Sequence, residues 1–478
     1  MARPKKTIRH KQAATSQFVR GLGLWDATAV VAGSMIGSGI FIVSADIARQ
    51  VGAPGWLLVV WLIAGVMTVI SALSYGELAA MMPHAGGQYV YLREAYGPLV
   101  GFLYGWTLFL VIQAGTIAAV AVAFGKFTAT LMPVFDTAVR VGRFSVSAQQ
   151  GLGIAIIVLL TAANCNGLRT GRLVQNVFTA TKVGSLLALV VFGLAVSRNP
   201  AAVHANFAQF WGSPSVSLIP LIGAAMVGAL FSADAWNNIT FAAAEVRDPA
   251  RTVPLSLAFG TSLVIGLYLA ANVVYLVALP LRGDPAATTA LGRGIQFAAS
   301  DRVATAAMQV MLGQGAAVLM ALAIIISTFG CDNGLILSGA RVYYAMARDG
   351  LFFGAAGFLN TRGVPAAALV LQGVWASVLT LSGTYSDLLD YVIFAALLFY
   401  VLTVGAIFVL RRTRPTAPRP YTAIGYPLVP AAYIVLAALI MIDLLIMKPR
   451  YTWPGLLIVA SGIPVFYAWR VTGEPVRR

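Results

Sequence analysis

The stretch Gly33-Ser34-Met35-Ile36-Gly37-Ser38-Gly39 lies in the middle of an apolar run that extends from about residue 23 to residue 50. The run is long enough to cross a bilayer as one helix. Its centre is poor helix material, because each glycine costs about 1 kcal/mol relative to alanine and serine side chains compete for backbone hydrogen bonds. The sequence therefore predicts a membrane-spanning helix that is unwound near its midpoint.

The rest of the chain has the composition of an integral membrane protein. Of its 478 residues, 59% are hydrophobic and only 10% are charged, whereas soluble domains are about 45–50% apolar and about a quarter charged. The long apolar runs lack the ten-residue alternation of barrel strands. We therefore predict an all-α polytopic membrane protein with about twelve transmembrane helices. The predicted spans are 23–50, 55–82, 98–125, 149–166, 173–197, 216–243, 253–280, 311–346, 365–382, 386–410, 425–447 and 452–470.

A second interruption falls in the sixth span, where residues 231–238 read Phe-Ser-Ala-Asp-Ala-Trp-Asn-Asn. Breaks in helices 1 and 6 are typical of transporters built from two inverted repeats, because a spacing of five spans starts the two helices on opposite sides of the membrane. For the first stretch alone, a small-residue packing face formed by Gly33 and Gly37 is the alternative. We predict a single transmembrane domain, 23–470, with repeat one at about 23–197, repeat two at about 216–410, and two C-terminal helices, 11 and 12, at about 425–470.

The formal charge of +16 is explained by lysines and arginines in loops that orient the chain, rather than by nucleic acid binding. Most of them lie at one face if the N-terminus is cytoplasmic. We therefore predict that residues 1–22 are a basic cytoplasmic segment, that 471–478 are a cytoplasmic tail, and that the chain is a multi-pass protein of the plasma (inner) membrane. Cys165 and Cys331 fall in or next to apolar spans, which favours small packing residues over a disulfide. The sequence indicates no metal site and no cofactor.

An unwound helix offers two kinds of backbone group at the middle of the membrane. The second half-helix begins with free amides at the positive end of its dipole, which suits a carboxylate. The first half-helix ends with carbonyls, which suit an ammonium group, so an amino acid zwitterion satisfies both. The predicted substrate-binding residues are Met35, Ile36, Gly37, Ser38, Gly39, Phe231, Ser232, Ala233, Asp234 and Asn237.

Three side chains in these spans need a specific explanation. The sequence is equally compatible with two roles for Phe231: an aromatic gate that closes over the ligand, and a side chain packed in the core. Asp234 is costly near a bilayer centre, so it must face a cavity, a partner or a proton path. Lys182 is too deep in the fifth span to reach the surface easily, so we expect it to point inward. Its ammonium would replace a coupling sodium ion at the first break, together with the hydroxyls of Ser327 and Thr328; a lysine that carries a transported proton and a structural pairing are the alternatives.

Several motifs accompany these residues. They are Gly33 to Phe41; Tyr75-Gly76-Glu77-Leu78 with Pro83, Gly86, Gly87 and Tyr89; Asn164-Cys165-Asn166-Gly167 with Gln175 and Lys182; Phe231 to Asn237 leading into Glu245-Val246-Arg247-Asp248-Pro249; and Ser338-Gly339-Ala340-Arg341 through Ala347-Arg348-Asp349-Gly350. Together they resemble the amino acid, polyamine and organocation (APC) permeases, most of all the L-type amino acid transporters and their bacterial relatives. The resemblance covers nearly the whole membrane region.

The resemblance implies a LeuT-like inverted repeat, alternating access, and a substrate held at the breaks in helices 1 and 6. It also implies a carboxylate site at Ser38 and Gly39, a gate at Phe231, and sodium independence with Lys182 in place of the ion. The chain departs from the eukaryotic L-type proteins at Asp234-Ala235, where those proteins carry two glycines, so substrate size stays open. Those proteins also bond to a glycoprotein through an outer-loop cysteine. Because no cysteine lies between spans three and four, we expect no disulfide-linked partner.

The sequence therefore predicts a sodium-independent secondary transporter of small or medium neutral L-amino acids that works by alternating access, with exchange favoured. Proton-coupled symport and carriage of cationic amino acids or polyamines are the alternatives; Asp234 and Asp332 would suit a dication, whereas Lys182 would repel it. A channel or a membrane-embedded enzyme is disfavoured, because neither a continuous polar pore nor a catalytic constellation is evident. Glu245 and Arg247, in a segment of alternating charge, form either a gate at the inner mouth or a solvated loop.

Overall fold

The computed structural model describes residues 20–141, 144–195, 199–213, 215–382 and 385–472. Most of the predicted basic segment and most of the predicted C-terminal tail lie outside these residues. The α-helices are α1 (Leu24–Met35), α2 (Gly39–Val51), α3 (Pro54–Met81), α4 (Gln88–Tyr96), α5 (Pro98–Thr107), α6 (Gln113–Leu131), α7 (Ala148–Cys165), α8 (Leu168–Ala195), α9 (Pro200–Phe207), α10 (Leu218–Ser232), α11 (Asn238–Phe241), α12 (Pro249–Ala278), α13 (Ala290–Arg293), α14 (Val303–Leu312), α15 (Gln314–Arg348), α16 (Ala366–Ser382), α17 (Tyr385–Thr413), α18 (Leu428–Met447) and α19 (Pro449–Thr472).

The remaining elements are short. A π-helix, η1 (Leu108–Ile112), joins α5 to α6, and one antiparallel hairpin pairs β1 (Ala138–Val141) with β2 (Phe144–Ser147). The 3-10 helices are η2 (Pro133–Asp136), η3 (Ala243–Glu245), η4 (Ala299–Asp301) and η5 (Gly354–Gly357). The described chain is therefore nearly all helical, as predicted.

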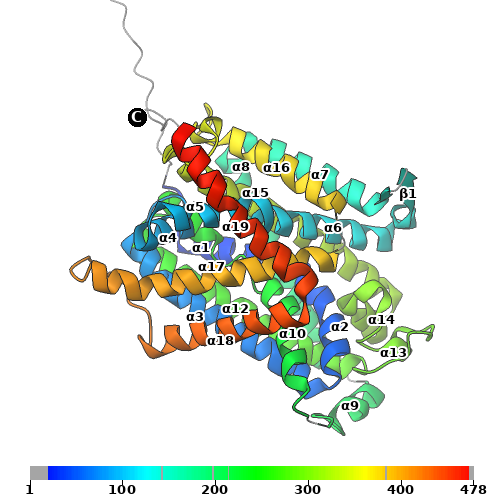
Figure 1. Ribbon diagram of the computed structural model, residues 1–478. Coiled ribbons are helices and arrows are strands. Elements are labelled where there is room, and N and C mark those ends of the chain that lie inside the picture. Colours follow the sequence, from blue (N-terminus) through cyan, green and yellow to red (C-terminus); the bar gives the residue numbers. More distant parts are fainter. Residues whose placement is uncertain (1–19, 142–143, 196–198, 214, 383–384, 473–478) are drawn as a thin grey trace, which may run out of the picture.

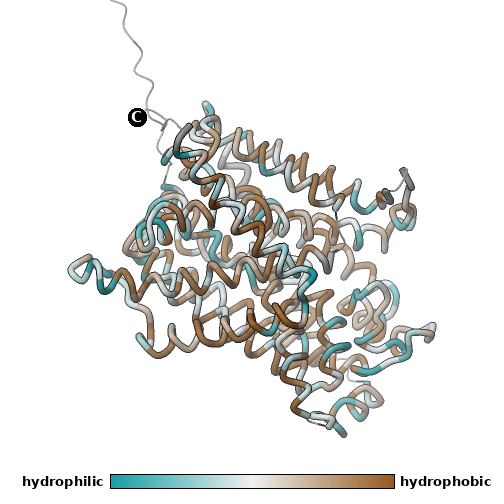
Figure 2. The backbone as a smooth tube through the Cα atoms, in the orientation of Figure 1, coloured by the Kyte–Doolittle hydropathy of each residue, from teal (hydrophilic) through white to brown (hydrophobic). Residues whose placement is uncertain are grey.

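The apolar helices match the predicted spans. In the described residues, nine helical segments are long and apolar enough to cross a membrane, with Pro98–Leu131 counted as one, and the bent pair of α1 and α2 makes a tenth. The shorter apolar helices α10 and α16 fall at predicted spans six and nine. Figure 2 shows hydrophobic residues along the helices and hydrophilic ones gathered near their ends. The prediction of an all-α polytopic membrane protein is confirmed.

Both predicted interruptions are present. Helix α1 ends at Met35 and α2 begins at Gly39, with a bend of 40° between them. Helix α10 ends at Ser232, and the next helical turn, α11, begins only at Asn238. Between α10 and α11, Ala235 has a positive φ of 64°, a conformation that an L-residue adopts only at a cost. Two membrane helices are thus unwound at the places that the sequence indicates.

The broken helices lie inside the bundle. Helix α1 packs against α8, α12 and α15, while α2 packs against α10. In Figure 1, α7, α8 and α16 lie along one side of the molecule, α3 and α18 lie along the other, and α19 crosses between them. The two unwound segments are therefore enclosed by helices that are distant in sequence, which excludes lipid from their open backbone groups.

The connections contain more structure than the sequence predicted. The segment 281–310, expected as a loop, includes α13, η4 and most of α14, and Gly313 with φ of 84° turns the chain into α15. The segment 126–148 includes the end of α6, then η2 and the hairpin. Local backbone pairing satisfies amides and carbonyls that would otherwise be exposed near the membrane.

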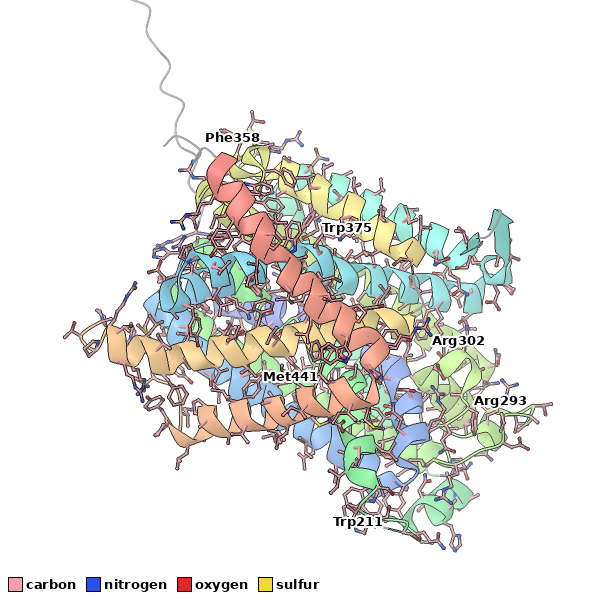
Figure 3. The ribbon with its side chains drawn as sticks, in the orientation of Figure 1. Trp211, Arg293, Arg302, Phe358, Trp375 and Met441 are labelled. Carbon is pink, nitrogen blue, oxygen red and sulfur yellow. The ribbon has the colours of Figure 1, made fainter. Side chains whose placement is uncertain are left out.

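The π-helix η1 has a visible structural effect. A wider turn displaces carbonyls from their regular helical partners. The indole Nε1 of Trp375, which projects from α16 (Figure 3), donates to the carbonyl of Leu110 at 2.9 Å. The irregular turn is thereby tied to a neighbouring helix.

Candidate functional site

The first break is held by a lysine. Lys182 of α8 is fully buried, and its Nζ donates to the carbonyl oxygen of Gly33 at 2.5 Å and to that of Ile36 at 3.0 Å. These carbonyls lie at the end of α1, where helical acceptors lose their donors. The ammonium of Lys182 thus supplies a donor to two backbone oxygens at the end of this helix.

Other side chains contact the neighbouring carbonyls of the same break. From α15, the Sγ of Cys331 donates to Ser34 at 3.1 Å, and the hydroxyl of Ser327 contacts the carbonyls of Ile36 at 3.1 Å and Gly37 at 3.3 Å. From α12, the hydroxyl of Tyr268 lies 3.0 Å from the carbonyl of Met35. All five successive carbonyls from residue 33 to residue 37 are therefore contacted by side chains from neighbouring helices.

Thr328 does not join this set. Its hydroxyl lies 3.0 Å from the carbonyls of Ile324 and Ile325, both in its own helix. Adjacent residues on a helix point about 100° apart, so Ser327 and Thr328 cannot both face the break. The structure places Ser327 at the break and Thr328 away from it.

The amides that follow the first break face the second break. Gly39 is the first residue of α2, and the first amides of a helix have no acceptor within the helix. A Cβ on Gly39 would lie 2.2 Å from the Oγ of Ser232, at the end of α10. Only glycine permits this approach. The hydroxyl of Tyr268 also lies 3.1 Å from the carbonyl of Ser232, so one side chain bridges the two breaks.

The second break presents side chains rather than a row of carbonyls. The Asp234 side chain is buried and accepts a hydrogen bond from the hydroxyl of Tyr400 on α17. The Nδ2 of Asn237 donates to the Oε1 of Gln88 at 3.0 Å, and Gln88 in turn donates to Thr403 at 3.0 Å. Asp234 and Asn237 are thus tied to α17 and α4.

Two small cavities border Asp234. The first has a polar wall, which includes Gln88, Tyr104, Gln113, Thr116, Asp234, Asn237, Asn238 and Tyr400. The second is bordered by α3, α10, α17 and α18, including Thr68, Ser71, Trp236 and Tyr433. In the described part of the chain, the hydroxyl of Tyr104 and the Nδ2 of Asn238 have no hydrogen-bond partner. Buried polar groups without partners are the groups that a polar ligand would satisfy.

The structure places the other predicted site residues nearby. Phe231 and Ser232 form the last turn of α10, both buried, and the carbonyl of Phe231 accepts from the amide of Asp234 at 3.1 Å. Ala233 lines the second of the two cavities. Phe231 is not among the residues that line either cavity, so its gating role stays a prediction.

The end of the sixth span that follows the second break contains the two predicted gating residues Glu245 and Arg247. Glu245 pairs with Arg341 of α15 at 2.7 Å, with both side chains almost fully buried, whereas Arg247 is exposed. The backbone around Glu245 is paired with the chain before α1, because the amides of Gly21 and Leu22 donate to its carbonyl. A third cavity lies beside this pair and reaches Asp26, Gln175 and Gly334. Of the two predicted gating residues, Glu245 is therefore in a buried ion pair with Arg341 and Arg247 is exposed, and a gate at this end stays a prediction.

Breaks in two membrane helices, with a polar cavity beside them and a lysine that binds the open carbonyls, are the features of a membrane transporter. The sequence matches the amino acid permease family model over residues 22–468. The chain belongs to this family and is a transporter of amino acids.

Curated relatives agree with the family. The b(0,+)-type amino acid transporter 1 of Homo sapiens is 29% identical over 471 residues, which cover 97% of this chain and 90% of that protein. The Large neutral amino acids transporter small subunit 2 of Homo sapiens is 29% identical over 454 residues, 93% of this chain and 79% of that protein. The Asc-type amino acid transporter 1 of Mus musculus is 29% identical over 466 residues, 96% of this chain and 83% of that protein. The similarity therefore extends over almost the entire chain.

Proposed function

We propose that this permease is a sodium-independent exchanger of small or medium neutral L-amino acids that works by alternating access. The observation that carries the proposal is the ammonium of Lys182 on the carbonyls of Gly33 and Ile36. A fixed cation at the first break supplies the positive charge that a bound sodium ion would supply in a sodium-coupled carrier. Transport then needs no sodium gradient, and exchange is the simplest cycle for such a carrier.

The arrangement favours binding of the substrate carboxylate at the first break and of the substrate ammonium at the second break. The carbonyls of residues 33–37 are already contacted by side chains, whereas the first two amides of α2, those of Gly39 and Ile40, have no acceptor within their helix. The substrate carboxylate therefore binds at Ser38 and Gly39, near the positive end of the α2 dipole. The substrate ammonium binds oxygens of the second break, where Asp234 adds a negative charge. The substrate side chain extends into the polar cavity lined by Gln88 and Tyr104.

Gating would involve both ends of the sixth span. Phe231 closes over the substrate from α10. The buried Glu245–Arg341 pair holds the inner end shut, because it ties η3 to α15 beside the inner cavity. Arg247, which is exposed, contributes only a surface charge. Opening to the inside then requires separation of a buried ion pair, which is costly unless both charges become hydrated.

The topology and assembly belong to the same proposal. One transmembrane domain contains repeat one, at about 23–197, and repeat two, at about 216–410, followed by helices 11 and 12. Both termini lie in the cytoplasm, in the plasma (inner) membrane, because this orientation puts most lysines and arginines inside. No disulfide-linked partner is required.

Asp234 supports a second candidate, carriage of cationic amino acids. A buried carboxylate beside a substrate cavity attracts a positively charged side chain. The hydroxyl of Tyr400 donates to Oδ1 of this carboxylate, and the backbone amide of Ala235 also bonds to the carboxylate. A carboxylate has about four acceptor positions, so a ligand can donate a further hydrogen bond.

Uptake into proteoliposomes tests both candidates. The purified full-length protein is reconstituted, and uptake of labelled L-alanine, L-serine, L-leucine, L-lysine and putrescine is compared in sodium and in choline buffer. We expect uptake of neutral amino acids that is unchanged in choline and is accelerated when the vesicles contain unlabelled substrate. Protein-free vesicles are the control.

Each result has a defined meaning. A requirement for sodium, or the absence of any amino acid uptake, would refute the proposed function. L-lysine uptake faster than that of every neutral amino acid would replace the first candidate by the second.

A further inference from the structure

Asp332 is a buried carboxyl group that the transport site described above does not use. It lies in the middle of α15, its side chain has no solvent exposure, and neither carboxylate oxygen has a hydrogen-bond partner among the described residues. An ionised carboxylate without donors in an apolar interior is unfavourable by several kcal/mol. The neutral acid is therefore the form that fits this conformation.

The charged neighbour of Asp332 is Lys182. The two side chains interact electrostatically, and the thiol of Cys331 interacts with both. The ammonium of Lys182 nevertheless binds the carbonyls of Gly33 and Ile36 instead of the carboxyl group. The pair is thus separated while the first break has its present shape.

The other elements packed against α15 bring neutral polar groups to this region. They include Ser34 of α1, Gln113 of α6, Asn164 of α7, Gln175 of α8 and Gln372 of α16. Asp26 of α1 is bound to Asn176, and Lys126 of α6 interacts with Asp301 and Arg302. Acidic residues, lysine, arginine and histidine are absent from six of the elements that pack against α15, namely α5, α7, α11, α14, α16 and η5. Within α15, Arg341 is paired with Glu245.

Polar groups lie between the inner cavity and the part of α15 that carries Asp332. The cavity beside Glu245 and Arg341 reaches Gln175 and Gly334, which lies two residues from Asp332 along α15. A Cβ on Gly334 would lie 3.2 Å from both the hydroxyl of Ser34 and the Oε1 of Gln175. Neither of these two side chains has a hydrogen-bond partner for its buried polar atoms in the described structure. Water or a proton could therefore pass from the inner cavity to the middle of the membrane.

We propose that Asp332 is a proton-binding site that couples net amino acid uptake to proton entry, with Lys182 as its switch. With Lys182 on the first break, Asp332 is the neutral acid. When the break moves and releases the ammonium, Lys182 pairs with Asp332, and the carboxyl group loses its proton to the inner cavity. The acid becomes a carboxylate, one proton leaves to the inside, and Lys182 stays an ammonium. The carboxylate takes up its next proton from the outside before the next uptake step, so one proton crosses for each amino acid. During exchange the carboxylate regains its proton from the inside before the carrier returns with the exchanged amino acid, so no net proton crosses.

This inference rests on the proposed amino acid transport, and the test separates the two. Vesicles contain the full-length protein and a pH-sensitive dye, and the best substrate from the uptake panel is added outside. Wild type is expected to acidify the lumen when the vesicles are free of amino acid. Asp332→Asn resembles the protonated acid and cannot release a proton. It should lose the acidification and keep exchange between labelled external and unlabelled internal substrate.

Asp443→Asn is the matched control. Asp443 is another carboxyl group in an apolar helix, α18, with one buried oxygen that lacks a partner in the described structure, and its variant should acidify the lumen like wild type. If Asp332→Asn elutes as aggregate from a sizing column, Asp332→Ser serves instead, with the same expected loss.

Three outcomes would overturn the proposal. The first is acidification by the Asp332 variant, and the second is amino acid uptake by wild type without acidification. The third is uptake by wild type that requires sodium and uptake by the Asp332 variant that does not, which would make Asp332 a cation ligand. In the second case the proposed amino acid transport still stands. If wild type shows neither uptake nor exchange, the proposed function itself fails.

Discussion

The first break comprises residues 36–38 and the second comprises residues 233–237, and the two are stabilised in different ways. At the first, between α1 and α2, backbone carbonyls are contacted by Lys182, Tyr268 and Ser327, which come from three different helices. At the second, between α10 and α11, the side chains of Asp234 and Asn237 make the contacts, and their partners come from α17 and α4. The first break is thus a backbone structure held by the surrounding helices, and the second is a group of side chains bordering a cavity.

This difference separates two tasks. Where the scaffold satisfies the backbone, the carbonyls of the break do not depend on the ligand for their hydrogen bonds. Where side chains line the cavity, a substitution changes the ligand that fits and leaves the backbone in place. Substitutions around the first break should therefore affect transport of every substrate, while those at Asp234 should change the order of preference among substrates.

The largest effect is expected from Lys182→Ala. The substitution removes the donor to the buried carbonyl of Gly33, whereas the carbonyl of Ile36 keeps its contact with Ser327. One unsatisfied group costs about 1–3 kcal/mol. The variant should lose uptake of all amino acids in the panel and unfold at a lower temperature in detergent. Uptake at the wild-type rate would contradict the role of Lys182 at the first break.

Lys182→Gln is the control for the loss of side-chain volume in Lys182→Ala. Its amide can donate to only one or two carbonyls and carries no charge. We expect the melting temperature to recover in part while uptake stays at background. Recovery of both would show that hydrogen bonding, rather than the positive charge, is the contribution of Lys182.

Both breaks could be predicted because their signal is local. Glycine, serine, aspartate and asparagine within an apolar run oppose a continuous helix wherever they occur. Lys182 could be predicted for the same reason, as one charge in an apolar span. The fold followed from the length and number of the apolar runs, and only the short elements between them were missed.

The partners of the breaks could not be predicted, because they depend on how helices pack. Tyr268 and Tyr400 are ordinary residues for a membrane helix, and the sequence does not give the direction of a hydroxyl group. Glu245 has a basic residue two positions away, yet it pairs with Arg341, 96 residues along the chain. Thr328 adjoins Ser327 but points elsewhere. Each of these contacts is fixed by helix rotation, which no local pattern encodes.

A smaller effect is expected from Gly39→Ala, which tests how closely the two breaks approach each other. The new Cβ would lie 2.2 Å from the Oγ of Ser232 and 2.8 Å from its Cα, so α2 and α10 must separate. Overpacking of this kind costs about 1–3 kcal/mol. The initial rate of uptake should fall for every substrate, both at saturating and at low substrate concentration.

Gly184→Ala is the matched control, because no heavy atom lies within 4 Å of its Cβ position in α8. That variant should transport like wild type. Equal rates for the two alanine variants would mean that the two breaks can separate without consequence.

The smallest effect is expected from Tyr268→Phe, which removes the hydroxyl shared by the two breaks. That hydroxyl lies 3.0 Å from the carbonyl of Met35 and 3.1 Å from that of Ser232, and it has a single proton to donate. Its loss should cost about 0.5–1.5 kcal/mol, which lowers the melting temperature slightly. Because the hydroxyl couples the movements of α1 and α10, the uptake rate should fall about fivefold, as expected for about 1 kcal/mol.

Tyr275→Phe distinguishes coupling from simple loss of a hydrogen bond. Tyr275 lies in the same helix, α12, and its hydroxyl donates at 3.3 Å to the carbonyl of Ile40, in only one of the broken helices. Both variants lose one buried hydroxyl, so their melting temperatures should be similar. If uptake also falls to the same extent in both, the bridge between the breaks has no special role, and the two halves of the site move independently.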